Sequence, residues 1–176
     1  MKSSIALIGF MGVGKTVVGL VLACKLGMIF VELDALIEHK MGKSIAQIFQ
    51  EDGEIAFREL EIEAVKEIAG NRNLVIACGG GVVLNKINID RLKQEAVIVW
   101  LTASPGVIMK RTSQDGEGRP VLWGTRTVSD IQSLLKFRKP FYERAADIKI
   151  DTSRLGVDAV AEQIIVKLKE YEGFSK

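Results

Sequence analysis

Phosphate binding is the first chemistry that the residue types and their spacing indicate. Residues 9–16 read Gly-Phe-Met-Gly-Val-Gly-Lys-Thr and fit the pattern G-x-x-x-x-G-K-[ST]. In such a loop the glycines let backbone N–H groups turn onto phosphate oxygens, and the positive end of the following helix points to the same place. Lys15 would reach the outer phosphates of a nucleotide, and the Thr16 hydroxyl would hold Mg²⁺. An apolar run precedes this loop and a helical pattern follows it, so the segment predicts a nucleotide site.

A pair of carboxylates, Glu32 and Asp34, follows the second apolar run of the chain. In an extended segment a spacing of two residues places both side chains on the same side. One carboxylate could support a metal ion while the other handles the proton of an acceptor hydroxyl, which is what a kinase needs. Switch and motor proteins instead place an aspartate after a later strand, whereas residues 74–81, LVIACGGG, end without one. An ordinary acidic strand end, with Asp34 capping the next helix, is the simpler alternative.

Two arginines and a run of glycines suggest an acceptor site. After Gly53, four residues recur at helical spacing and share one face, namely Glu54, Phe57, Arg58 and Glu61. An arginine held between glutamates can read a carboxylate, although a solvated, salt-bridged face is the commoner arrangement. Gly79–Gly81 would allow close backbone approach to a ligand, and Arg138 lies in a helix bent at Pro140. Together with a carboxylate, these groups could bind a small polyhydroxy acid.

Short strands alternating with helices must position these residues. The predicted strands are Ser4–Ile8, Met28–Glu32, Leu74–Cys78, Val97–Leu101 and Asp147–Asp151. The first four are continuous apolar runs, as expected of strands covered on both faces. Helix ends are predicted by a capping box at Ser44 and Gln47, by Ser104 before Pro105, and by three glycines where helices should stop. Those glycines are Gly27, Gly53 and Gly70. This alternation predicts a parallel sheet with right-handed crossovers.

Composition sets limits on the function. The chain has 176 residues, 48% of them apolar and 26% charged, which is typical of a single globular domain. A net charge of +2 is too small to suggest nucleic-acid binding. Cys24 and Cys78 lie in apolar stretches and are expected to be buried free thiols. Lys25 and Gly27 break the longest apolar stretch, so we expect no membrane span and a cytoplasmic location.

Over nearly its whole length the sequence resembles the shikimate kinase family. The residues that carry the resemblance are GFMGVGKT, Asp34 with ALIE, GKSIAQIFQEDGEIAFRELE, GGGVV, RTSQDGEGRPVL, FRKPFYERAA and IDTSR. The combination D-G-E-x-x-F-R-x-x-E, G-G-G and R-P is far more specific than the phosphate loop. The resemblance implies transfer of the γ-phosphate of ATP to the 3-hydroxyl of shikimate, in the pathway to chorismate and aromatic amino acids.

The resemblance also implies an architecture. It is an α/β, three-layer P-loop kinase fold like that of nucleoside monophosphate kinases, with a five-stranded parallel sheet flanked by helices. Residues 1–176 would form a single domain, with a mobile lid at about 112–126 and a substrate-binding helical region at about 33–61. The family precedent favours a monomer, with ATP and shikimate as its small-molecule substrates.

Individual roles follow from the resemblance by position. Asp34 would act as base, Lys15 and the lid residue Arg119 would stabilise the transferring phosphate, and Arg58 and Arg138 would clamp the shikimate carboxylate. The implied ATP site comprises Gly12, Val13, Gly14, Lys15, Thr16, Val17, Arg111, Arg119 and Arg154. The implied shikimate site comprises Asp34, Phe49, Phe57, Arg58, Gly79, Gly80, Gly81 and Arg138. The implied ligands of Mg²⁺ are Thr16 and Glu32.

This chain departs from the family pattern at Glu32, because the family usually shows D-x-D where this sequence has Glu32-Leu33-Asp34. Glutamate keeps the charge and adds a methylene, which alters its reach toward a metal-bound water. Two alternatives to shikimate phosphorylation are a kinase of another hydroxy acid, such as gluconate, and an inactive nucleotide-binding relative that serves as a regulatory module. The presence of Asp34, Arg58 and Arg138 together argues against the inactive relative, and R-x-x-E with G-G-G argues against gluconate.

Overall fold

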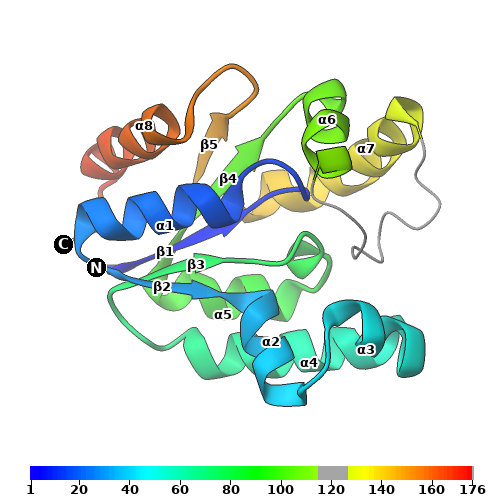
Figure 1. The fold of residues 1–176 in the computed structure, drawn as a ribbon. Coiled ribbons are helices and arrows are strands. Elements are labelled where there is room, and N and C mark those ends of the chain that lie inside the picture. Colours follow the sequence, from blue (N-terminus) through cyan, green and yellow to red (C-terminus); the bar gives the residue numbers. More distant parts are fainter. Residues whose placement is uncertain (115–126, 176) are drawn as a thin grey trace.

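Residues 1–114 and 127–175, which the structure describes, form a five-stranded parallel sheet with helices on both faces in the computed structural model (Figure 1). The strands are β1 Ser4–Ile8, β2 Ile29–Glu32, β3 Leu74–Ala77, β4 Ala96–Thr102 and β5 Ile148–Asp151. Their order across the sheet is β2-β3-β1-β4-β5. Each predicted strand is present with its ends within one residue of the prediction, so the predicted α/β architecture is confirmed.

The helices that connect and cover the strands differ widely in length. They are α1 Lys15–Leu26, α2 Leu33–Met41, α3 Ile45–Glu51, α4 Gly53–Ile68, α5 Lys86–Glu95, α6 Pro105–Gln114, α7 Val128–Ala145 and α8 Val157–Glu170, with a short 3₁₀ helix, η1, at Val82–Leu84. In the described part of the chain, none of these helices is long and apolar enough to cross a membrane.

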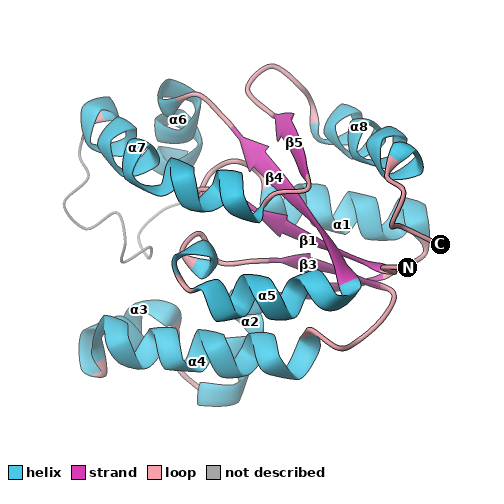
Figure 2. Cartoon of the chain, turned by 180° about the vertical axis from the view of Figure 1, so that it is seen from behind, coloured by secondary structure: helices cyan, strands magenta, loops and turns pink. Residues whose placement is uncertain are grey.

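The central strand β1 divides the core into two layers because its side chains alternate between the faces of the sheet. Ala6 and Ile8 face one apolar cluster, which α2 to α5 help to build. Ile5 and Leu7 face a second cluster, built mainly by α1, α6 and α8. Figure 2 shows α4, α5 and α7 in front of the sheet, with α1 behind it. All five residues of β1 are buried, as predicted for a strand covered on both faces.

Local sequence signals define several helix ends. At the start of α3, Ser44 and Gln47 form the predicted capping box, with the Gln47 N–H donating to the Ser44 hydroxyl at 3.2 Å. Gly27 ends α1 in the left-handed conformation, with φ of 59°. Gly53 separates two helices rather than simply ending one. With φ of 83° it follows α3 and is the first residue of α4.

The prediction that both cysteines are buried is wrong for Cys24. Its thiol is exposed on α1, whereas Cys78 is buried after β3. Leu20, one helical turn before Cys24, is also exposed, at 51%. Both residues lie on the outward face of α1, while Val18 and Leu22 point inward. Because most residues of α1 are apolar, the sequence did not show which side of this helix faces solvent.

Candidate active site

The phosphate-loop segment connects β1 to α1 at the carboxyl end of the sheet, where parallel sheets bind ligands. Gly9 and Gly12 have φ of 145° and 76°, conformations that residues with a side chain rarely adopt. A Cβ on Gly12 would also lie 2.9 Å from the Thr112 side chain. The glycines therefore permit a tight turn that brings the N-terminus of α1 to the site.

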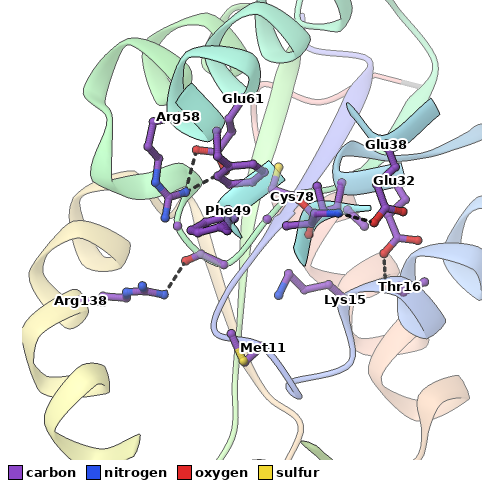
Figure 3. Close-up of a pocket in the computed structure, with 17 residues that line it drawn as sticks. Met11, Lys15, Thr16, Glu32, Glu38, Phe49, Arg58, Glu61, Cys78 and Arg138 are labelled. Carbon is purple, nitrogen blue, oxygen red and sulfur yellow. Dashed lines mark hydrogen bonds and ion pairs between the residues drawn. The ribbon is translucent and has the colours of Figure 1, made fainter. Parts of the chain in front are cut away.

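Lys15 and Thr16 begin α1 and reach into the same cleft. The Lys15 ammonium donates to the carbonyl oxygens of Gly9 and Phe10 at 2.8 and 3.0 Å. It thus lies across the loop rather than out in solvent. The Thr16 hydroxyl donates to a carboxylate oxygen of Glu32 at 2.7 Å, which ties the loop to the end of β2 (Figure 3).

The geometry predicted for Glu32 and Asp34 is wrong, although both residues line the cleft. Glu32 ends β2, but Asp34 already lies in the first turn of α2, so the two are not on one extended segment. The simpler alternative is also wrong, because Glu32 holds the capping position of α2. A Cβ on Gly79 would come within 2.8 Å of an Asp34 carboxylate oxygen. Asp34 therefore lies directly against the backbone that follows β3.

Arg58 is fixed from both sides by glutamates on α4. Its guanidinium donates to Glu54 at 3.1 Å. It also donates to Glu61 at 3.1 Å (Figure 3). A side chain on Gly81 would overlap the guanidinium, so only glycine leaves room for Arg58 there. The spacing of these residues on one helix face predicted this cluster.

Glu61 was predicted only as a partner that holds Arg58, yet it also lines the cleft and is fully buried. Burial raises the pKa of its carboxyl to about 7, with the nearby Asp34 charge adding to the rise and the Arg58 guanidinium opposing it. Its spacing of three residues from Arg58 was the available signal. What the spacing could not show was that this glutamate, unlike Glu54, faces the protein interior.

Arg138 reaches the cleft from α7, on the opposite side from α4. It is only 5% exposed, and its guanidinium donates to the Gly80 carbonyl at 3.4 Å. The Tyr142 hydroxyl donates to the same carbonyl at 2.7 Å. Among the described residues, the buried Nε of Arg138 has no hydrogen-bond partner. A buried charged donor without an acceptor is costly, so this guanidinium is suited to an anionic ligand.

The cleft encloses about 220 Å³. Its apolar wall includes Phe49 and Phe57, whose ring centroids lie 4.6 Å apart. It brings together many of the residues predicted from the resemblance, which are Lys15, Thr16, Glu32, Asp34, Phe49, Phe57, Arg58, Gly79, Gly80, Gly81 and Arg138. Figure 3 shows the labelled side chains around this space.

The described residues predicted to bind the rest of ATP do not line this cleft. Arg111 on α6 donates to the Gly12 carbonyl at 3.2 Å and to the Thr152 carbonyl at 2.9 Å, so it braces the phosphate loop. The buried Thr152 hydroxyl, which was not predicted, donates to the Val13 carbonyl at 2.9 Å. Arg154 is exposed.

The other predicted ATP residues differ in exposure or fall outside the described part of the chain. Val17 is half-exposed on α1, and Val13 is buried in the loop. Arg119 and most of the predicted lid lie outside the described residues.

The oxygen ligands beside the phosphate loop suit Mg²⁺. Within the described residues there is no cluster of three or more acidic, histidine or cysteine side chains that could hold a metal ion. Mg²⁺ does not require one, because it keeps several waters and takes one or two protein oxygens along with substrate phosphates. The Thr16 hydroxyl and Glu32 carboxylate, 2.7 Å apart, are oxygens of this kind.

Comparison with known proteins shows which family the chain belongs to. The family model described as shikimate kinase matches residues 11–169. A shikimate kinase of Thermodesulfovibrio yellowstonii is 47% identical over 172 residues, covering 98% of this chain and 96% of the relative. A shikimate kinase of Pelotomaculum thermopropionicum is 45% identical over 168 residues, covering 96% of each.

A solved structure extends the likeness to three dimensions. Shikimate kinase from Acinetobacter baumannii, in complex with shikimate, is 34% identical and covers 98% of this chain and 96% of its own. The two folds match with a TM-score of 0.92. Sequence and fold thus agree over almost the whole chain, which belongs to the shikimate kinase family.

Proposed function

We propose that the cleft carries out the family's reaction, the transfer of the γ-phosphate of ATP to the 3-hydroxyl of shikimate. The products are shikimate 3-phosphate and ADP, and the reaction serves chorismate and aromatic amino acid biosynthesis. One observation carries the assignment of this cleft. The guanidinium groups of Arg58 and Arg138 approach Gly79–Gly81 from two different helices, next to Asp34 and facing the phosphate loop.

The two arginines bind the carboxylate of shikimate in this proposal. Each guanidinium can offer two parallel N–H donors to a carboxylate, which fixes the orientation of the acid as well as its position. Glu54 and Glu61 hold Arg58 in place before the substrate arrives. The phenylalanine wall of Phe49 and Phe57 covers the apolar part of the ring.

Asp34 accepts the proton of the 3-hydroxyl as this oxygen attacks phosphorus. Its place against Gly79 puts a carboxylate in the same cleft as both arginines and Lys15. Proton transfer to a positioned carboxylate is the role expected of a kinase base.

Lys15 stabilises the transferring phosphate by exchanging its carbonyl partners in the loop for phosphate oxygens. The backbone from Gly12 to Gly14 and the N-terminus of α1 add N–H donors. The family resemblance adds Arg119 as a further cation for this step, and it places Val13, Val17, Arg111 and Arg154 around the remainder of ATP.

Thr16 and Glu32 would hold Mg²⁺, which when bound neutralises phosphate charge. The hydrogen bond between them keeps the Thr16 hydroxyl oriented toward the site. We further propose that the chain acts as a cytoplasmic monomer, with ATP and shikimate as its small-molecule partners.

A coupled assay of ADP release tests this function. With ATP and Mg²⁺, shikimate should give rapid turnover, whereas gluconate and a reaction without acceptor should give only background. Equal rates with and without shikimate would contradict the proposal. Faster turnover with gluconate than with shikimate would assign a different acceptor to the cleft.

A further inference from the structure

A second cavity, which we call the α7 cavity, lies between α7, the strands β4 and β5, and the phosphate loop. It is open to solvent, has a volume of about 360 Å³ and shares no lining residue with the active-site cleft. Of the described residues predicted to bind ATP, only Val13 lines it. A space of this size is in the range of small-molecule sites.

The inner wall of the α7 cavity is apolar. Phe10, Leu101 and Leu135 contribute to it, together with Trp100. The Trp100 and Tyr142 rings stack at 5.5 Å with 11° between their planes. Because these rings pack on each other, the apolar wall is rigid, and a rigid wall favours a planar apolar ligand over a flexible one.

The rim of the cavity is positive. Lys136, Lys139 and Lys149 line it, and no aspartate or glutamate does so among the described residues. The Lys149 ammonium lies 4.5 Å from the centroid of the Trp100 ring. Lys139 pairs with Glu143 at 3.6 Å, and both side chains are more than half exposed, so water screens this pair. The cavity therefore combines an apolar interior with a surplus of positive charge.

Two residues of the cavity also contact the active site. The Tyr142 hydroxyl donates to the Gly80 carbonyl, which also accepts from Arg138. The guanidinium carbon of Arg138 lies 5.5 Å from the centroid of the Phe10 ring. A ligand that shifts Tyr142 or Phe10 would thus move groups that hold Arg138.

We propose that the α7 cavity binds a small planar anion of the aromatic carboxylate class, and that this binding changes the affinity of the active site for shikimate. The apolar wall takes the ring and the lysine rim takes the carboxylate. Tyr142 and Phe10 couple the two sites. The coupling rests on the proposed function, whereas the binding does not.

Calorimetry with 2-naphthoate tests the binding, with the neutral 2-naphthamide as its matched control. We expect one molecule of 2-naphthoate to bind per chain, at least about tenfold more tightly than the amide. A non-hydrolysable ATP analogue with Mg²⁺ should leave this affinity within about twofold. Absence of naphthoate binding, equal binding of the amide, or displacement by the ATP analogue would each overturn the proposal.

Variants then locate the site. Lys136→Gln and Lys149→Gln should each weaken 2-naphthoate binding about threefold to fivefold, as loss of one partly exposed charge partner implies. Lys169→Gln, on α8 and outside the cavity, should leave it unchanged. If Lys169→Gln has the same effect as the two rim variants, only net charge matters and the site is not the α7 cavity.

Reciprocal titrations test the coupling. 2-Naphthoate should change the Kd of shikimate, and shikimate should change the Kd of 2-naphthoate by the same factor. In Tyr142→Phe, 2-naphthoate should still bind, and this factor should approach one. Unchanged coupling in Tyr142→Phe, or no coupling in the unaltered chain, would overturn the proposal that the two sites are coupled. Because binding is measured without turnover, a failure of the proposed reaction remains distinguishable from a failure of the α7 cavity.

Discussion

Replacing Glu61 by glutamine should remove a pH-dependent contribution to stability. The folded chain raises the pKa of this buried carboxyl from an ordinary 4.5 to about 7. A raised pKa means that folding favours the protonated form. The carboxyl thus opposes folding least below pH 4.5, and its burial cost grows as the pH rises to about 7. Integration of this pKa shift between pH 5 and pH 8 gives a decrease of about 2–3 kcal/mol in the free energy of unfolding.

Urea unfolding from pH 5 to pH 8 measures this effect. The free energy of unfolding of the unaltered chain should fall by about 2–3 kcal/mol relative to Glu61→Gln over this range. Glu63→Gln is a matched control, because Glu63 is on the same helix and its side chain is 66% exposed. If the free energies of unfolding of the unaltered chain and Glu61→Gln differ by the same amount at every pH, the assignment of a raised pKa is refuted.

Substitutions in the cleft give three further predictions. Lys15→Ala should abolish turnover while the chain still folds, and near-normal activity would contradict its role at the phosphates. Asp34→Asn should be nearly inactive even at high Mg²⁺, while Glu32→Asp should remain active with an altered Mg²⁺ requirement; substantial turnover by Asp34→Asn would assign the base elsewhere. Gly79→Ala should lower kcat, because its Cβ would meet the Asp34 carboxylate at 2.8 Å, and Gly70→Ala, with open space around it, should not. Equal kinetics of the two alanine variants would show that Gly79 is not tightly packed.

The sheet and the phosphate loop could be predicted from the sequence because their signals are local. Continuous apolar runs mark strands covered on both faces, and the strand ends were predicted to within one residue. Residues 9–16 carry their own conformational requirement, since glycine is needed where φ is positive. The capping box at Ser44 is likewise complete within four residues.

Features that depend on packing could not be predicted in this way. The spacing of Glu32 and Asp34 gave no indication that a helix begins between them, so their relation was wrong even though both line the cleft. The apolar residues around Cys24 gave no indication of which side of α1 faces solvent. Likewise, no local pattern separates Arg111, which braces the phosphate loop, from an arginine in an open site.

The most direct test of the proposed site measures whether Arg58 and Arg138 bind the same carboxylate. Calorimetry would compare shikimate with its methyl ester, and an ATP analogue would be titrated in parallel, for Arg58→Met, Arg138→Met and the exposed control Arg144→Met. Each cleft variant should lose about 2–4 kcal/mol of shikimate binding, roughly 30-fold to 1000-fold, with ATP-analogue affinity preserved. The ester, which carries no carboxylate charge, should bind the unaltered chain and both cleft variants about equally weakly. Losses below about threefold, or equal losses for shikimate and the ATP analogue, would contradict the assignment of this cleft to shikimate.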